Sequence, residues 1–293
     1  MYARFYPGMQ WSDCAAHWPL AAHSRFVQAA GVRWHVQVMG QGPVVLLLHG
    51  TGSGSFSWRG VAPLLAPHFT VVAPDLPGHA FSSRGPSGAL SLPGMAQAAS
   101  ALLHQLNLRP HALVGHSAGA AVAAQMALHH RGMDRCQVVG LNPAWLPLSG
   151  AAAWLFSPMA RLADLNPLSA WILARLAARP GMVDDALART GSTLDASGRA
   201  LYRQVLSHTG HVHGVLSMMA AWDIRPLGQA LHTLRNPVFL HIGLQDQTVP
   251  PAQADQALQR LPQARCVRLP GLGHLAHEED PPGAAAQLMD WLA

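Results

Sequence analysis

The sequence predicts an α/β fold in which helices cover both faces of a mostly parallel central sheet. Short runs of Val, Leu and Ile recur along the 293-residue chain, each bounded by turn residues. These runs are continuously apolar, which indicates strands that are buried on both faces. Helical patterns alternate with them, as crossover helices do between parallel strands. Hydrophobic residues make up 50% of the chain and charged residues 11%, a composition that excludes a disordered protein.

The expected elements can be placed in chain order. Residues 33–39 alternate like an edge strand, and we expect them to form an antiparallel hairpin with the segment before them. Buried strands are expected at residues 44–48, 71–73, 112–114, 138–141, 238–242 and 266–269. Crossover helices are expected at residues 95–106, 118–130, 252–261 and 282–292.

The strand rhythm stops after residue 141 and resumes at residue 238. Between them lie helical patterns at residues 151–165, 169–178, 195–207 and 212–221. The sequence therefore predicts a core of residues 1–143 and 229–293, with a helical cap of residues 144–228 inserted in it. An apolar helical insertion is typical of a lid over an active site, although an ordinary helical subdomain is the alternative. As substrate-binding residues of this cap we expect Trp145, Met218 and Trp222.

Charge and cysteine usage exclude several classes of protein. All 19 basic residues are arginines, and with 14 acidic residues they give a net charge of +5. The arginines are scattered without a run of three, so we expect no nucleic-acid partner. The three cysteines, Cys14, Cys136 and Cys266, lie far apart and predict neither a disulfide framework nor a zinc site. We expect no metal and no cofactor.

Targeting signals are weak. The first thirty residues contain no continuous apolar segment, so we expect a cytoplasmic protein without a secretory signal. Residues 136–160 carry no charge, but several prolines interrupt them. We interpret this stretch as a buried strand followed by an apolar insertion, not as a membrane span. Peripheral contact with a membrane surface stays open.

The strongest chemical motif is Gly115-His116-Ser117-Ala118-Gly119, which matches G-x-S-x-G. It lies directly after an expected strand and before an Ala-rich helix, the context of a nucleophile elbow. The two glycines are needed because strand and helix approach each other closely at such a turn. Ser117 is therefore the expected nucleophile.

A serine nucleophile needs a base, and the base needs an orienting carboxylate. Asp246 follows the strand at 238–242, and His274 follows the strand at 266–269. Both are thus expected beyond the carboxyl ends of parallel strands, where open α/β sheets place their sites. The chain order Ser117, Asp246, His274 differs from the orders found in chymotrypsin and subtilisin.

An oxyanion hole completes the predicted site. The strand at 44–48 runs into His49-Gly50-Thr51-Gly52-Ser53-Gly54. We expect the backbone N–H groups of Thr51 and Ala118 to be the two donors. A phosphate-binding loop is the alternative, but the sequence lacks the GK[ST] that such a loop requires.

Other polar residues are given structural roles. Asp75 also follows a strand, but it precedes the nucleophile in the chain and is expected to organise a loop. We interpret Glu278 and Glu279 as charges at a helix N-terminus. His211 and His213 lack a third ligand at a suitable spacing, so they predict no metal site.

With these motifs, nearly the whole chain resembles the α/β-hydrolase superfamily. A narrower resemblance rests on segments outside the catalytic motifs, including cap segments, which vary most in this superfamily. These segments are 32–37, 46–52, 73–79, 91–95, 116–121, 190–195 (TGSTLD), 211–223 and 271–279. Together they look like the magnesium chelatase accessory proteins of bacteriochlorophyll biosynthesis in photosynthetic bacteria. One departure is Ala80, where many hydrolases have glycine.

The resemblance implies a role in the magnesium-tetrapyrrole pathway, and the residues imply a serine hydrolase. The expected substrate is a small hydrophobic molecule with an ester-like bond, for which a tetrapyrrole ester is one candidate. Two alternatives stay open: a non-catalytic protein that binds a tetrapyrrole or associates with magnesium chelatase, and a hydrolase of C–C bonds. Magnesium itself is not an expected ligand, since the sequence offers no carboxylate cluster.

Overall fold

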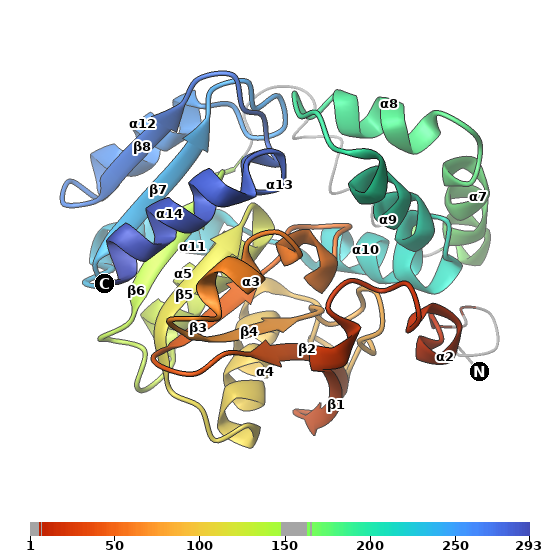
Figure 1. The fold of residues 1–293 in the computed structure, drawn as a ribbon, viewed down its shortest axis with the longest axis horizontal. Coiled ribbons are helices and arrows are strands. Elements are labelled where there is room, and N and C mark those ends of the chain that lie inside the picture. The colour runs from red at the N-terminus through yellow and green to blue at the C-terminus, as the bar shows by residue number, and fades with distance from the viewer. Residues whose placement is uncertain (1–5, 7, 148–162, 165) are drawn as a thin grey trace.

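A computed structural model of the chain describes residues 6, 8–147, 163–164 and 166–293, and it confirms the α/β architecture (Figure 1). Eight strands form one sheet in the order β1-β2-β4-β3-β5-β6-β7-β8. The strands are β1 (Ser24–Ala29), β2 (Val32–Met39), β3 (Val44–Leu48), β4 (Thr70–Pro74), β5 (Pro110–His116), β6 (Gln137–Leu141), β7 (Val238–Gly243) and β8 (Arg265–Leu269). The pairs β1–β2 and β2–β4 are antiparallel, and all other neighbours are parallel.

The expectation that residues 33–39 form an edge strand is wrong, although the expected hairpin exists. In the structure β2 lies between β1 and β4, and the two edges of the sheet are β1 and β8. The expectation that the strand at 266–269 is buried is also wrong, because as an edge strand β8 has only partly buried and exposed residues. Two of the polar residues that produced the alternation at 33–39, His35 and Gln37, are buried and bonded within the protein, whereas Arg33 is exposed. His35 Nδ1 lies 2.8 Å from Asp75 Oδ2, and Gln37 Nε2 donates to the carbonyl of Pro19. Alternation here reflects internal hydrogen bonding, not exposure to solvent.

Helices bury both faces of the sheet. Leu46 and Leu48 of β3 point into one core cluster, while Val45 and Leu47 point into the other. The first cluster is covered by α4 (Leu92–Gln105), α5 (Ala118–His129), α11 (Arg225–Ala230) and α12 (Ala252–Arg260). The second is covered by α3 (Ala62–Leu65) and α14 (Pro281–Leu292). This two-sided burial explains the continuously apolar strands.

Further helices lie between β6 and β7, on one side of the molecule (Figure 1). They include α7 (Pro167–Ala177), α8 (Met182–Ala188), α9 (Ala196–Leu206) and α10 (Thr209–Ala221). Three of them match expected helices, whereas α8 is too short for its periodicity to be read. The helix expected at residues 151–165 falls almost wholly outside the described residues. The division into core and cap stays a prediction, and its second boundary lies inside α11.

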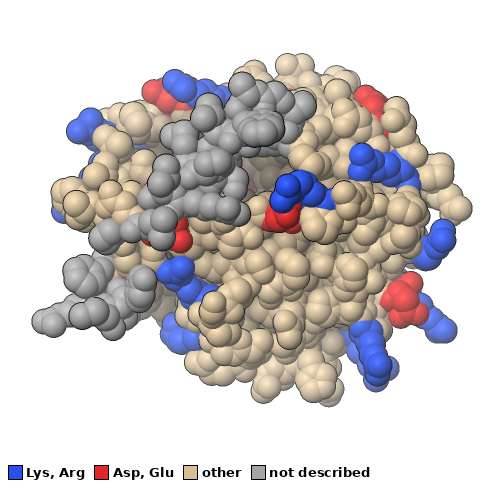
Figure 2. Space-filling view, turned by 180° about the vertical axis from the view of Figure 1, so that it is seen from behind, with Lys and Arg blue, Asp and Glu red and all other residues tan. Residues whose placement is uncertain are grey.

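The remaining elements are short. They are α2 (Trp11–Cys14), α13 (Ala276–Glu279) and the 3₁₀ turns η1 (Ala21–His23), η2 (Ser55–Trp58) and η3 (Leu231–Thr233). None of the helices within the described ranges has both the length and the apolar character needed to cross a bilayer. On the face seen in Figure 2, charged side chains lie singly or in small groups on a largely uncharged surface.

Candidate active site

Ser117 lies at the sharp turn between β5 and α5. Its backbone angles are φ 52° and ψ −117°, a conformation that costs strain for any residue except glycine. A Cβ on Gly119 would lie 2.1 Å from the carbonyl oxygen of Leu48, and one on Gly115 would lie 2.3 Å from the amide nitrogen of Ala120. Both glycines are therefore required for the close approach of β5, β3 and α5 that supports this turn.

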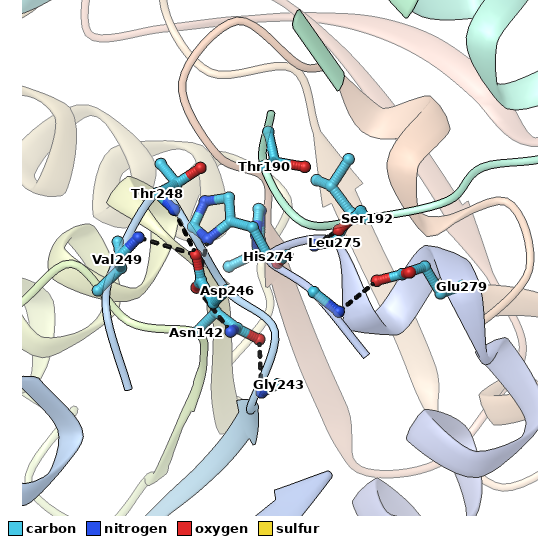
Figure 3. Close-up of polar contacts among 12 residues, drawn as sticks. Asn142, Thr190, Ser192, Gly243, Asp246, Thr248, Val249, His274, Leu275 and Glu279 are labelled. Atoms are coloured by element: carbon cyan, nitrogen blue, oxygen red, sulfur yellow. Dashed lines mark hydrogen bonds and ion pairs between the residues drawn. The ribbon is translucent and has the colours of Figure 1, made fainter. Parts of the chain in front are cut away.

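Asp246 and His274 form a buried pair at the carboxyl ends of β7 and β8 (Figure 3). Nδ1 of His274 lies 2.7 Å from Oδ2 of Asp246, and the residues are 5% and 4% exposed. The other carboxylate oxygen accepts the backbone N–H groups of Thr248 and Val249 at 2.7 and 2.8 Å. Since a carboxylate only accepts, the proton of a neutral His274 lies on Nδ1, which leaves Nε2 as the basic nitrogen.

Asn142 is a site residue that the sequence reasoning missed. It follows β6 with a positive φ of 45°, and its Nδ2 donates to Oδ2 of Asp246 at 2.7 Å (Figure 3). It thereby fills the remaining position on the carboxylate and fixes the side-chain orientation of Asp246. The signal that could have revealed it is a polar residue at the carboxyl end of a buried strand.

Residues 190–193, from the TGSTLD segment, connect the loops that carry Asp246 and His274 (Figure 3). The carbonyl of Thr190 accepts N–H groups from both Gln247 and His274. Ser192 Oγ accepts the N–H of Leu275 at 2.8 Å. Glu279 bridges the N–H groups of Thr193 and Gly273, each at 2.8 Å. Glu279 thus holds the loop that carries His274, residues 270–275, which we refer to as the histidine loop. This role was not included when the sequence led us to interpret Glu279 as a charge at a helix N-terminus.

His116 connects the elbow to the histidine loop. Its Nε2 lies 2.9 Å from the carbonyl oxygen of His274, and the two rings are 4.7 Å apart. Burial, together with the nearby His277 and His274, holds the pKa of His116 well below its usual value. A neutral ring donates Nε2–H to that carbonyl. His116, the residue before Ser117, is therefore hydrogen-bonded to the backbone of His274, the predicted base.

The turn after β3, residues 49–54, lies beside Ser117, and we refer to it as the oxyanion turn after its predicted role. A Cβ on Gly50 would be 3.3 Å from Cβ of Ser117, and the N–H of Ser53 closes the turn on the carbonyl of Gly50. Helix α5 begins at Ala118, so the N–H of Ala118 has no acceptor within the helix. Ala118 directly follows the serine, and Thr51 directly follows Gly50, which lies beside it. That their N–H groups form an oxyanion hole stays a prediction.

The three expected substrate-binding residues lie in different environments. Trp145 is 1% exposed and packs in the core, with its indole N–H donating to the carbonyl of Ala120 at 2.8 Å. Met218 is equally buried, and its sulfur lies 4.0 Å from Oγ1 of Thr51. Trp222 is partly buried against the same core cluster. Of the three, Met218 is the one that contacts the oxyanion turn.

Helices α9 and α10 are bonded to the oxyanion turn at two further points. The hydroxyl of Tyr202 lies 2.7 Å from Oε1 of Glu278 and 3.2 Å from Oγ of Ser53. Nε2 of His211 lies 3.2 Å from the carbonyl of Gly52, and its Nδ1 accepts the N–H of Ala80. Burial lowers the pKa of His211 to about 4, so the neutral ring bridges the two loops.

Glu278 lies in the first turn of α13, and its side chain is buried. It contacts Arg59, which also pairs with Asp195 at the start of α9. Burial raises the pKa of Glu278 to about 7, against the opposing effect of Arg59. These contacts form one network, which connects α9 both to the oxyanion turn and to α13, the helix after the histidine loop. Its members are Ser53, Tyr202, Glu278 and Arg59.

Tyr202→Phe is expected to lower the free energy of unfolding by about 1–3 kcal/mol, because Glu278 and Ser53 lose a buried partner. In a double-mutant cycle with Glu278→Leu, which removes the acceptor, urea denaturation should give a coupling energy of about 1 kcal/mol or more. The pair Tyr202→Phe and Arg268→Gln shares no partner and serves as the additive control. Additive effects of Tyr202→Phe and Glu278→Leu would contradict the network.

Asp75 and a separate cavity lie outside this constellation. Asp75 is fully buried and contacts His35, Ser55 and Phe81. Burial alone would raise its pKa, but His35 first, and then His49 and the N–H of Ser55, lower it to about 2. Asp75 organises its loop, as the sequence indicated. A cavity of about 450 Å³ lies at the amino ends of β7 and β8. Asp246 and His274 lie at the opposite ends of these strands, so this cavity is not the substrate pocket of Ser117.

Comparison with known proteins identifies the class. The chain belongs to the α/β hydrolase fold family, whose model matches residues 43–281. It is 37% identical over 279 residues to the magnesium-chelatase 30 kDa subunit of Rhodobacter capsulatus, which covers 94% of this chain and 97% of that protein. It is also 30% identical to a pimeloyl-[acyl-carrier protein] methyl ester esterase of Aromatoleum aromaticum, over 81% of this chain and 94% of that protein.

Solved structures agree on the fold. A thermophilic esterase from Thermogutta terrifontis superposes with a TM-score of 0.74 at 23% identity, covering 92% of this chain and 98% of its own. The enol-lactonase from Burkholderia xenovorans gives a TM-score of 0.75 at 22% identity, covering 92% and 99%. The chain is thus an α/β hydrolase related to a magnesium-chelatase subunit.

Proposed function

We propose that the chain is a serine hydrolase that cleaves an ester-like bond in a hydrophobic substrate of magnesium-tetrapyrrole metabolism. The observation that carries this proposal is the His274–Asp246 pair at 2.7 Å, beyond the carboxyl ends of β7 and β8, which run parallel to the strand that leads into the elbow, β5. Four contacts, with His274, Asn142, Thr248 and Val249, fix the orientation of the Asp246 carboxyl group toward the imidazole of His274.

In the proposed reaction, Oγ of Ser117 attacks the carbonyl carbon of the ester, and Nε2 of His274 takes the hydroxyl proton. The oxygen of the tetrahedral intermediate accepts the N–H groups of Thr51 and Ala118. Collapse breaks the C–O bond, and the leaving alkoxide takes the proton from His274. Water, deprotonated by His274, then releases the acid and regenerates Ser117.

Two observations support the class of substrate. Met218 and Leu206 border the oxyanion turn, with Cδ2 of Leu206 3.8 Å from the position of a Cβ on Gly52. Apolar side chains at this position favour a hydrophobic acyl group or alcohol. The relation to a methyl ester esterase favours a carboxylic ester, and the relation to a magnesium-chelatase subunit favours a tetrapyrrole.

A second candidate function is that of a non-catalytic protein that binds a tetrapyrrole or associates with magnesium chelatase. The name of the Rhodobacter relative, which matches nearly the whole chain, favours it. Intact geometry at Asp246 and the strained turn at Ser117 favour catalysis instead, because a strained conformation persists only where the surrounding structure imposes it.

Labelling with a fluorophosphonate probe separates the two functions. We expect mass spectrometry to place one adduct on Ser117, and we expect a porphyrin methyl ester to block it. Ser117→Ala should remove the adduct, whereas the control Ser197→Ala, at an exposed serine of α9, should retain it. A wild-type protein that binds the porphyrin but takes no label would overturn the hydrolase proposal in favour of the binding function.

A further inference from the structure

Helix α7 exposes an unusual set of large apolar side chains. Leu168, Trp171, Ile172 and Leu173 are 60%, 51%, 45% and 41% exposed. They are four of the seven large hydrophobic residues that are exposed in the described part of the chain. Scattered apolar side chains are normal on a protein surface, but a contiguous group marks a contact site.

The burial pattern of α7 is inverted. On the side that faces the molecule, Ala170 and Ala174 are 1% and 2% exposed and pack against Val212 and Leu216 of α10. A helix that covers a protein core normally turns its large apolar residues inward. In α7 the alanines point inward and the large residues outward, so core packing does not account for the outward side.

Arginines lie on and beside the same side. Leu168, Ile172 and Arg175 are spaced by four and three residues, which places them along one side of α7. Arg179, which is also exposed, follows two residues after the end of the helix. The guanidinium of Arg175 lies 5.5 Å from the ring centre of Trp171. Residues 167–181 contain no acidic residue. Trp, Leu and Ile beside arginines form the pattern of a helix that lies in an anionic lipid interface.

We propose that this outward side of α7, defined by Leu168, Trp171, Ile172 and Arg175, docks the protein onto an anionic lipid bilayer together with Arg179, which follows the helix. The apolar side chains enter the headgroup boundary, and the arginines contact lipid phosphates. A second copy of the chain fits less well. One side of an 11-residue helix offers only about 200 Å², against roughly 800 Å² per partner in a stable complex.

The position of α7 connects this surface to the candidate active site. α7 packs on α10, and Met218 of α10 contacts the oxyanion turn at Thr51. Docking therefore places the bilayer one helix away from the oxyanion turn. The binding itself does not depend on the role of Ser117.

The test is flotation of the full chain with vesicles of phosphatidylcholine, alone or mixed equally with phosphatidylglycerol. We expect binding to the mixed vesicles that weakens with added salt. Arg175→Gln with Arg179→Gln should weaken it by roughly fivefold for each arginine. Trp171→Gln with Ile172→Gln should weaken it by about tenfold or more.

Matched controls remove equivalent side chains elsewhere. Arg131→Gln with Arg135→Gln removes the same charge near the amino end of β6, and Leu64→Gln replaces a leucine that is 41% exposed on α3. Both should leave flotation unchanged. No flotation of the wild type, or equal losses in test and control variants, would overturn the proposal. So would a dimer that Trp171→Gln and Ile172→Gln abolish, because the face would then bind a second copy.

Discussion

Ser117→Ala is expected to lower kcat for hydrolysis of a p-nitrophenyl ester by about 10⁴-fold or more. The substitution removes the only atom that can form the acyl-enzyme in the proposed mechanism, while the oxyanion donors and the apolar surroundings remain. The residual rate should therefore still exceed that of the uncatalysed reaction. Initial rates under saturating ester measure the effect.

Asp246→Asn is the companion variant, because it keeps the shape of the side chain and removes its charge. An amide at this position can present its NH₂ group to His274, which favours the tautomer with the proton on Nε2 and removes the base. We expect kcat to fall by about 10³–10⁴-fold while KM changes little. Full activity in either variant would rule out the assigned roles.

The second large effect is a loss of stability in mild acid. His79, His116 and His277 are at most 2% exposed. Burial holds the pKa of each well below its ordinary value, and neighbouring histidines lower it further. These rings therefore stay neutral in the folded protein, whereas in the unfolded chain they become protonated near pH 6.5.

The sign of the effect follows from proton binding. Below about pH 6.5 the unfolded state binds more protons than the folded state, so the free energy of unfolding falls as the pH falls. At pH 5 each of the three histidines contributes a loss of at most about 2 kcal/mol, the value for a ring that stays fully neutral in the folded protein. Their sum is comparable with the total stability of about 5–15 kcal/mol that is typical of native proteins.

Glu278 acts in the opposite direction. Because burial raises its pKa to about 7, its contribution to stability increases as the pH falls from 7 toward the ordinary value of a glutamate. His211 and His241, each with a pKa lowered by burial to about 4, add to the loss and outweigh this single group. The net expectation is a marked decrease in Tm between pH 7.5 and pH 5.

Thermal unfolding followed by circular dichroism at several pH values tests this expectation. His79→Gln should reduce the pH dependence by about one proton, and the control His17→Gln, at an exposed histidine, should leave it unchanged. A Tm that stays constant between pH 7.5 and pH 5 would show that the buried histidines do not govern acid stability.

Much of the fold was predictable from sequence because its signals are local. The apolar run of β3 and the bounds of α5 follow from periodicity and turn residues within a dozen positions. The position of β2 was not predictable in this way. His35 and Gln37 look like exposed positions until their partners, Asp75 and Pro19, are known, and those partners come from other parts of the chain.

The sequence by itself indicated the approximate positions of the strands and the candidate reactive side chains that follow them: Ser117, Asp246 and His274, each in a turn after a strand. Only the tertiary structure decided what supports those side chains, including Asn142 on Asp246 and Thr190 under both loops. It also turned Trp145 into the core and buried Glu278 with Tyr202. The physical reason is that hydrogen bonding and burial depend on partners brought together by packing, and no spacing along the chain encodes them.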